Sequence, residues 1–114
     1  MRTNFQMENQ NITMIAGNTV AFNVEVYDDE GNLITVDSAD MVCKKDANGN
    51  ENVFHKSLGA GITQEQGIMT VRVAPEDTRE VEAGRYFYAF QIGVDSDIYT
   101  LMAGVLSIEQ NVVY

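Results

Sequence analysis

Apolar and polar residues alternate along this chain with a period of two, and that period constrains the fold more than any other feature of the sequence. In the clearest segment, 19–27, Val20, Phe22, Val24 and Val26 fall on one side of an extended backbone. Successive side chains of a β-strand point to opposite faces, so this pattern predicts a strand with one buried face. No segment of helical length shows a period of about 3.6 residues, which argues against helices that connect parallel strands.

Turn residues separate the predicted strands, among them Gly31, the pair Asn48-Gly49, and Gly67. The single proline, Pro75, opens a segment at 75–80 whose acidic start predicts one helical turn that crosses between two sheets. About seven or eight strands, with turns roughly every 8–12 residues, predict an all-β, antiparallel sandwich. Besides 19–27, the expected strands lie at 11–15, 33–36, 40–45, 53–56, 68–73, 81–92 and 98–108, the last with a bulge or close approach at Gly104.

A local pattern in the segment before the aromatic strand indicates which kind of sandwich this is. Val81, Gly84 and Tyr86 follow an apolar-x-x-Gly-x-Tyr order. That order is typical of a tyrosine corner, in which the phenol hydroxyl bonds back to the upstream backbone of an immunoglobulin-like sandwich. The chain has no tryptophan and one cysteine, so the core tryptophan and disulfide of antibody domains are absent.

Length and charge set further bounds. A chain of 114 residues has the usual size of one domain, which we expect to span 1–114 with flexible tails at 1–9 and 110–114. Arg2 has no apolar run behind it, so we expect no signal peptide, and no stretch approaches the ~18 apolar residues that membrane insertion needs. Seventeen acidic and seven basic residues give a net charge of −10, which argues against nucleic acid as a partner.

Cys43 and His55 are the only pair that suggests nucleophilic catalysis. They flank the hairpin expected at Asn48-Gly49, so the two strands could bring them near each other. Thiol catalysis needs a lowered thiol pKa and usually a third, orienting group, and the sequence indicates neither. We therefore favour a small core thiol and an ordinary strand histidine, and we expect no catalytic residue and no cofactor.

Carboxylates gather in two predicted turns, at Asp28-Asp29-Glu30 with Asp37 and Asp40, and at Asp95 with Asp97. Their oxygens are calcium ligands by type, but neither spacing matches a known calcium loop. Aspartate is common in turns because its side chain bonds to the nearby backbone. We expect solvated turn residues and no metal site.

An aromatic group at Tyr86, Tyr88, Phe90 and Tyr99 could stack on sugars. In a sandwich, however, the inward row of this strand is core, so packing is the favoured interpretation for the row 86, 88 and 90. The sequence leaves open which side Phe87 and Tyr99 face.

The ordered string of these features is similar to small immunoglobulin-like proteins of phage and prophage tail and baseplate regions, and resembles the N-terminal domain of the baseplate upper protein family. The resemblance covers about residues 12–109, without the longer C-terminal region of those proteins. The matching stretches are 16–20, 29–33, 74–78, 81–88 and 104–109.

The resemblance implies a non-catalytic structural or protein-interaction module of a phage-derived particle, in its tail, baseplate or fibre. It implies assembly in the bacterial cytoplasm and a final place in the virion. The implied partners are other phage structural proteins or copies of the chain itself in a homo-oligomer. The alternative from another class is a carbohydrate- or ligand-binding sandwich, which requires solvent-facing aromatic rings.

Overall fold

The computed structural model describes residues 8–9, 11–46, 48–49 and 51–113. Nine strands and one short helix occur in this part of the chain. Their bounds are β1 Glu8–Asn9, β2 Ile12–Ile15, β3 Val20–Glu25, β4 Ser38–Lys44, β5 Asn52–Leu58, β6 Gly61–Glu65, β7 Ile68–Val73, α1 Pro75–Thr78, β8 Gly84–Val94 and β9 Asp97–Glu109.

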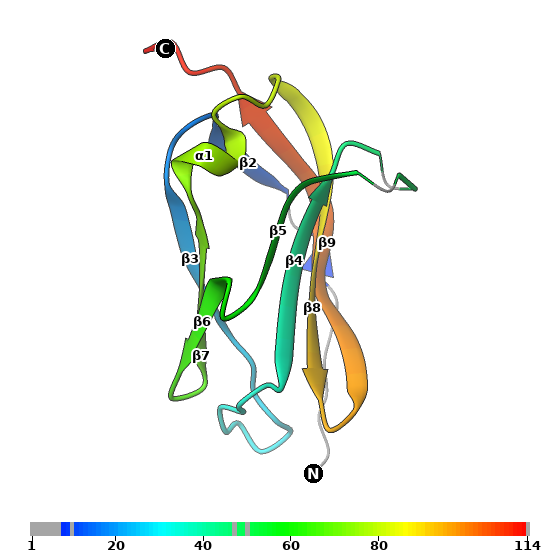
Figure 1. Cartoon of the computed structure of the whole chain (residues 1–114). Coiled ribbons are helices and arrows are strands. Elements are labelled where there is room, and N and C mark those ends of the chain that lie inside the picture. The colour runs from blue at the N-terminus through cyan, green and yellow to red at the C-terminus, as the bar shows by residue number, and fades with distance from the viewer. Residues whose placement is uncertain (1–7, 10, 47, 50, 114) are drawn as a thin grey trace.

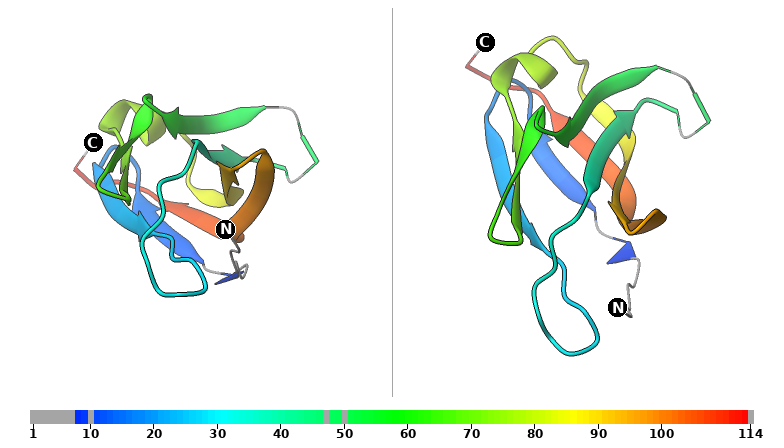
Figure 2. Two further views of the ribbon diagram at one scale, coloured as in Figure 1. Left: turned by 90° about the horizontal axis from the view of Figure 1, so that it is seen from below. Right: turned by 60° about the horizontal axis from the view of Figure 1, so that its bottom comes forward.

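The strands form two layers that pack face to face (Figures 1 and 2). One layer contains β5, β4, β8 and β9, with β1 and β2 along the far edge of β9, and the other contains β6, β7 and β3. Pairing is antiparallel within the layers except for β1 and β2, which run parallel to β9. A short parallel contact between Ser57–Leu58 and Gly61–Ile62 joins the layers. The fold is the expected all-β, immunoglobulin-like sandwich.

The core lies between the layers and follows the alternation of the strands. In β4, Met41 and Cys43 point inward and are fully buried, and in β7 the same holds for Met69, Val71 and Val73. Burial of such apolar surface is the main favourable contribution to folding. The remaining buried apolar residues are Met14, Ala16, Val26, Ile34, Val36, Ala39, Phe54, Ile62, Tyr86, Tyr88, Phe90, Ile92, Val94, Leu106 and Ile108.

The helical crossover expected at 75–80 is the four-residue helix α1, and it connects β7 in one layer to β8 in the other (Figure 1). Pro75 stands in its first turn, and the Asp77 carboxylate accepts a 2.7 Å hydrogen bond from the backbone N–H of Ala74. Thr78 is fully buried, and its Oγ1 accepts a 2.9 Å hydrogen bond from the backbone N–H of Gly17. The helix α1 is therefore bonded to the turn that follows β2.

The expected strand at 33–36 forms only one bridge, between Leu33 and Tyr27. The Ile34 N–H donates a 2.9 Å backbone hydrogen bond to the carbonyl of Val26. Beyond it, Ile34 and Val36 are buried, and the Gln64 amide bonds to both the N–H and the C=O of Val36, at 2.8 and 3.1 Å. Side-chain bonds at Val36 thus take the place of a continued strand ladder, which the apolar alternation alone could not reveal.

The bulge of the last strand does not lie at Gly104, which pairs in register with Tyr88. The register of the β8–β9 pair shifts between Phe90 and Gln91, and the extra residue on β9 is Leu101. The prediction of a bulge at Gly104 was wrong because glycine was taken as its marker, whereas a bulge needs only one additional residue on one strand.

Residues of both expected tails contact the sandwich where the structure describes them. Glu8–Asn9 form β1 and pair with Met102 and Ala103, in the same parallel register that β2 continues on β9. The Asn111 side chain donates a 2.9 Å hydrogen bond to the carbonyl of Ala16. The other N-terminal residues, 1–7, and residue 114 lie outside the described residues.

Candidate functional site

The turn before β8 has the geometry of a tyrosine corner. The Tyr86 hydroxyl donates a 2.5 Å hydrogen bond to the backbone carbonyl of Glu82, four residues upstream. Val81 packs against the core, and Gly84 opens β8 at a position where an added side chain would meet no atom within 4 Å. The three pattern residues therefore shape the entry into β8, and Val81 also lines a hollow of about 460 Å³ together with Arg79 and Asn111.

Cys43 and His55 lie on neighbouring strands but on opposite faces of their sheet. Cys43 pairs with Phe54, and both are buried, whereas His55 pairs with Val42 on the outer face. Burial raises the pKa of the Cys43 thiol to about 12, so the thiol is protonated near neutral pH. The sheet itself separates the two groups, and they do not form a thiol–imidazole pair.

Three of the carboxylates, Asp28, Asp37 and Asp40, bond to backbone N–H groups or to His55. Asp28 Oδ1 accepts bonds of 2.9 Å from the N–H groups of Glu30 and Asn32, as turn aspartates do. Asp37 accepts a 3.0 Å bond from the N–H of Asp95, which places the two predicted clusters side by side. Among the described residues, no three His, Cys, Asp or Glu side chains are grouped to hold a metal ion.

The aromatic residues of β8 divide between the two faces of the sheet. Tyr86, Tyr88 and Phe90 point into the core, and burial raises the pKa of the Tyr88 phenol. Phe87 points outward and is 43% exposed, which decides the side that the sequence left open. Tyr99 is partly buried on β9.

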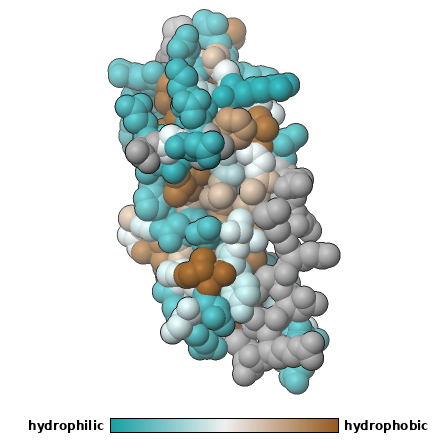
Figure 3. Space-filling view, turned by 90° about the vertical axis from the view of Figure 1, so that its right-hand side faces the viewer, coloured by the Kyte–Doolittle hydropathy of each residue, from teal (hydrophilic) through white to brown (hydrophobic). Residues whose placement is uncertain are grey.

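Five apolar side chains cross the outer face of the sheet, and we call them the outer strip: Val42, Phe87, Ala89, Ala103 and Val105. Phe87 is paired with Val105, and Ala89 lies between Val42 on β4 and Ala103 on β9. Residues directly opposite on neighbouring strands contact each other, so these side chains form a continuous patch. Figure 3 views this side of the molecule, where pale and brown surfaces interrupt the hydrophilic ones.

A shallow hollow of about 320 Å³ lies over β4 and β8 at the outer strip. Val42, Phe87 and Ala89 line it, together with the polar side chains of Asp40, Lys44 and Gln91. Apolar centres with polar rims are the usual anatomy of protein-binding surfaces.

The polar rim of the outer strip is close to neutral, although the whole chain carries a net charge of −10. His55 Nε2 is hydrogen-bonded to Asp40 Oδ1 at 2.9 Å, and both side chains are nearly half exposed. The Lys44 ammonium donates a 3.1 Å bond to the carbonyl of Gly49, and Arg85 is exposed on the same side of β8 as Phe87. An approaching acidic protein therefore meets less repulsion on this face than the net charge suggests.

The sequence did contain a signal for the outer strip. In the segments 41–43, 86–90 and 101–106, nearly all residues are apolar, at odd and even positions alike. A strand with one solvated face would instead alternate apolar and polar residues. Such runs indicate that both faces of a strand are apolar. The prediction used these segments only to assign the side chains that face the core, and so it missed the apolar side chains of the outer strip.

No protein-family model matches this chain, and no curated protein matches its sequence. Among solved structures, it is similar to the CBM51-2 and INT domains of Clostridium perfringens ZmpB, with 16% identity and a TM-score of 0.48 over 93% of this chain. The matched region spans 19% of the chain in that structure. It is also similar to the natural killer cell receptor NKp44, with 18% identity and a TM-score of 0.45, covering 91% of this chain and 99% of that one.

The class that the topology defines is an immunoglobulin-like β-sandwich with an apolar outer sheet face. Within the residues that the structure describes, no helix has the length and apolarity needed to cross a membrane.

Proposed function

We propose that this chain is a non-catalytic structural and protein-interaction module that binds a neighbouring protein through the outer strip. The phage-derived particle that the sequence resemblance implies is the setting we propose for it. The observation that carries the proposal is Phe87, a large aromatic side chain left 43% exposed beside Val105 and Ala89 on the outer sheet face. Its place in a particle rests on the sequence resemblance.

The energetics of the strip favour a protein partner. Full burial of a phenylalanine side chain contributes about 1.5–3 kcal/mol, of which a partner gains the part that belongs to the exposed 43% of Phe87. Val42 and Ala89 beside it add to the area that a partner covers. Binding energy at protein interfaces concentrates in a few aromatic anchors, while the surrounding contacts exclude water. The polar side chains of Asp40, His55 and Lys44 stand where an interface rim would lie.

The alternative, carbohydrate recognition, has less support in the arrangement of the rings. Phe87 is exposed, but Tyr86 and Tyr88 on either side of it point into the core. Two of the rim groups that could bond to sugar hydroxyls, Asp40 and His55, are already bonded to each other. A glycan site also needs several free polar groups that converge beside the stacking ring.

The test uses the proteins encoded by the genes next to the one for this chain, each co-expressed with it and purified. Phe87→Arg places a charge within the strip, and Val112→Arg makes the same kind of change at a site that is 92% exposed outside it. We expect one neighbour protein to co-purify with wild type and Val112→Arg and to be lost with Phe87→Arg. Circular dichroism melts check that both variants fold.

Two results would count against the proposal. If no neighbour protein binds, or if Phe87→Arg binds as well as Val112→Arg, the outer strip is not the interface. If Phe87→Ala instead abolishes binding on a glycan array while no protein binds, the carbohydrate alternative replaces it.

A further inference from the structure

A second surface, separate from the outer strip, lies at the opposite edge of the sandwich. β3 pairs with β7 along one side, and in the described part of the chain no backbone group pairs with its other side between residues 20 and 25. In many immunoglobulin-like sandwiches the first strand lies beside the second. Here the preceding strand, β2, pairs with β9 instead, so the position next to β3 is open.

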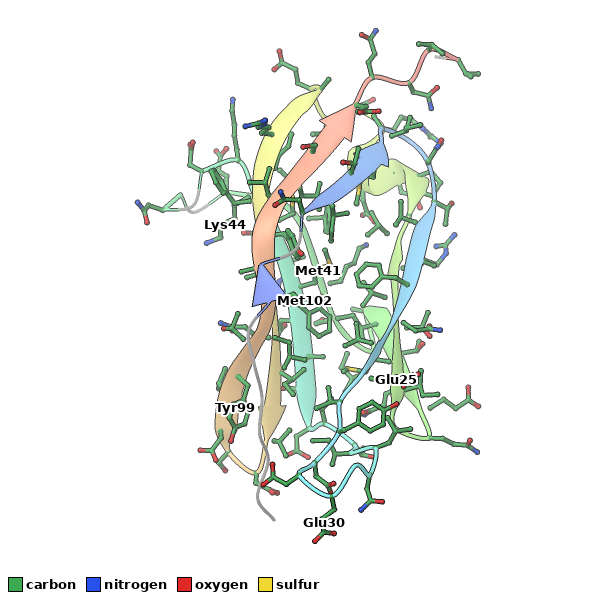
Figure 4. All side chains as sticks on the ribbon, turned by 180° about the vertical axis from the view of Figure 1, so that it is seen from behind. Glu25, Glu30, Met41, Lys44, Tyr99 and Met102 are labelled. Atoms are coloured by element: carbon green, nitrogen blue, oxygen red, sulfur yellow. The ribbon has the colours of Figure 1, made fainter. Side chains whose placement is uncertain are left out.

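The open position leaves apolar side chains partly exposed. Val20, Phe22 and Val24 point toward the interior of the sandwich yet are only partly buried, whereas their partners on β7 are fully buried. A groove of about 500 Å³ runs beside these side chains, and Ile12 and Met102 lie on its far wall. Figure 4 looks onto this side, with Met102 and Glu25 marking the two walls of the groove.

The edge of β3 lacks the features that usually block strand addition. It contains no proline, lysine or bulge, and its pairing with β7 runs in unbroken register. Its one charged residue is Glu25, at the end of the strand, whose carboxylate accepts a hydrogen bond from the Tyr27 hydroxyl. In a chain with 17 acidic residues, this edge is therefore unusually compatible with another copy.

We propose that β3 pairs with β3 of a second copy in antiparallel orientation, about a two-fold axis at Phe22. In this register Phe22 faces Phe22 of the second copy, and Val20 faces Val24. On the outer face Ala21 opposes Asn23, and Thr19 opposes Glu25, so no like charges are opposed. An isologous contact of this kind closes as a dimer. The contact pairs the backbone groups on the open side of β3 and covers the partly exposed side chains of Val20, Phe22 and Val24.

The register makes a charge-reversal experiment possible. Ala21 and Asn23 are exposed, and the two-fold axis places Ala21 of each copy opposite Asn23 of the other. Ala21→Glu/Asn23→Glu puts carboxylates opposite carboxylates, and Ala21→Lys/Asn23→Lys puts ammonium groups opposite each other. Like charges opposed across strands destabilise pairing, so each double variant should associate about tenfold more weakly than wild type. Mixed together, the two variants place opposite charges in both pairs and should form a heterodimer.

Sedimentation equilibrium measures the association of each protein up to about 1 mM. We expect a dimer for wild type, a dissociation constant about tenfold higher for each double variant, and tighter association in the mixture than in either variant alone. Asn23 also accepts a 2.9 Å hydrogen bond from Thr70, so thermal melts of both variants check that the loss of this bond leaves the fold intact.

The proposal is overturned if wild type stays monomeric at the highest concentration, or if the mixture behaves as its separate components do. Phe87→Arg distinguishes this contact from the outer strip, since it should leave the dimer unchanged. If Phe87→Arg abolishes the dimer and the β3 variants do not, copies meet through the outer strip. Failure to bind a neighbour protein has no bearing on this measurement.

Discussion

The Lys56 ammonium lies 2.6 Å from the Asp77 carboxylate, and this ion pair joins β5 to α1. Both side chains are largely buried, with 14% and 20% exposed. The Asp77 carboxylate also accepts the hydrogen bond from the N–H of Ala74 at the start of the helix. One carboxylate thus fixes both the helix and its position against the sheet.

Removal of the Asp77 carboxylate should lower the free energy of unfolding more than removal of the Lys56 ammonium does. Asp77→Ala loses the helix cap and leaves Lys56 without its partner, so we expect a loss of about 2 kcal/mol in the free energy of unfolding. Lys56→Met keeps the cap and much of the apolar contact, and we expect about 1 kcal/mol. Urea denaturation measures both. Equal losses would show that the cap contributes little.

The tyrosine corner offers a test of one hydrogen bond. Tyr86→Phe removes the hydroxyl that donates to the carbonyl of Glu82 and keeps the buried ring, so the protein should lose about 1 kcal/mol of stability. Tyr27→Phe is the control, because its hydroxyl bonds to Glu25 at an exposed site where water can replace it. If both variants lose the same amount, the corner adds no stability of its own.

The alternation of the sequence was sufficient to predict the strands with one buried face. β3 and β7 both follow it, because each packs one face into the core and a one-residue shift would expose that face. The partner of β2 was beyond prediction. Its parallel place on β9 depends on contacts between residues about ninety positions apart, such as Ile12 with Leu106.

The outer strip shows a second limit of sequence reasoning. Phe87 stands in a run in which every residue from 86 to 90 is apolar, so local alternation could not decide its side. Phe87 faces outward because its neighbours Tyr86 and Tyr88 face inward. Both tyrosine rings are buried in the core, and the Tyr86 hydroxyl also bonds to the carbonyl of Glu82. By contrast, the separation of Cys43 from His55 follows from register alone, once the hairpin is known.

The contact between Thr78 and Gly17 links α1 to the turn after β2. Thr78→Val preserves the shape of a fully buried side chain but removes the oxygen to which the Gly17 N–H donates. A lost buried hydrogen bond of this kind should cost about 1–3 kcal/mol, measured by urea denaturation. Thr78→Ser keeps the hydroxyl and should lose less. A more stable Thr78→Val would contradict the role that we assign to this hydrogen bond.

The buried thiol of Cys43 should make stability fall in alkaline solution. Its pKa is raised from 9.0 to about 12 in the folded protein, so between these values the unfolded chain loses a proton that the folded chain keeps. The folded state then binds more protons, and the free energy of unfolding decreases as pH rises through this window. Tyr88, whose phenol pKa burial also raises, acts in the same direction.

Urea denaturation at about pH 8 and about pH 11 measures this fall, and Cys43→Ala isolates the contribution of the thiol. The variant loses core packing at every pH, but its stability should decline less between the two pH values, because only Tyr88 and other groups still titrate. The native thiol should also react with a thiol-specific reagent at least about 100-fold more slowly than the urea-unfolded chain, since the thiolate is the reactive form. Rapid reaction of the folded protein, or the same alkaline decline in wild type and Cys43→Ala, would show that the thiol is accessible and that β4 does not hold it in the core.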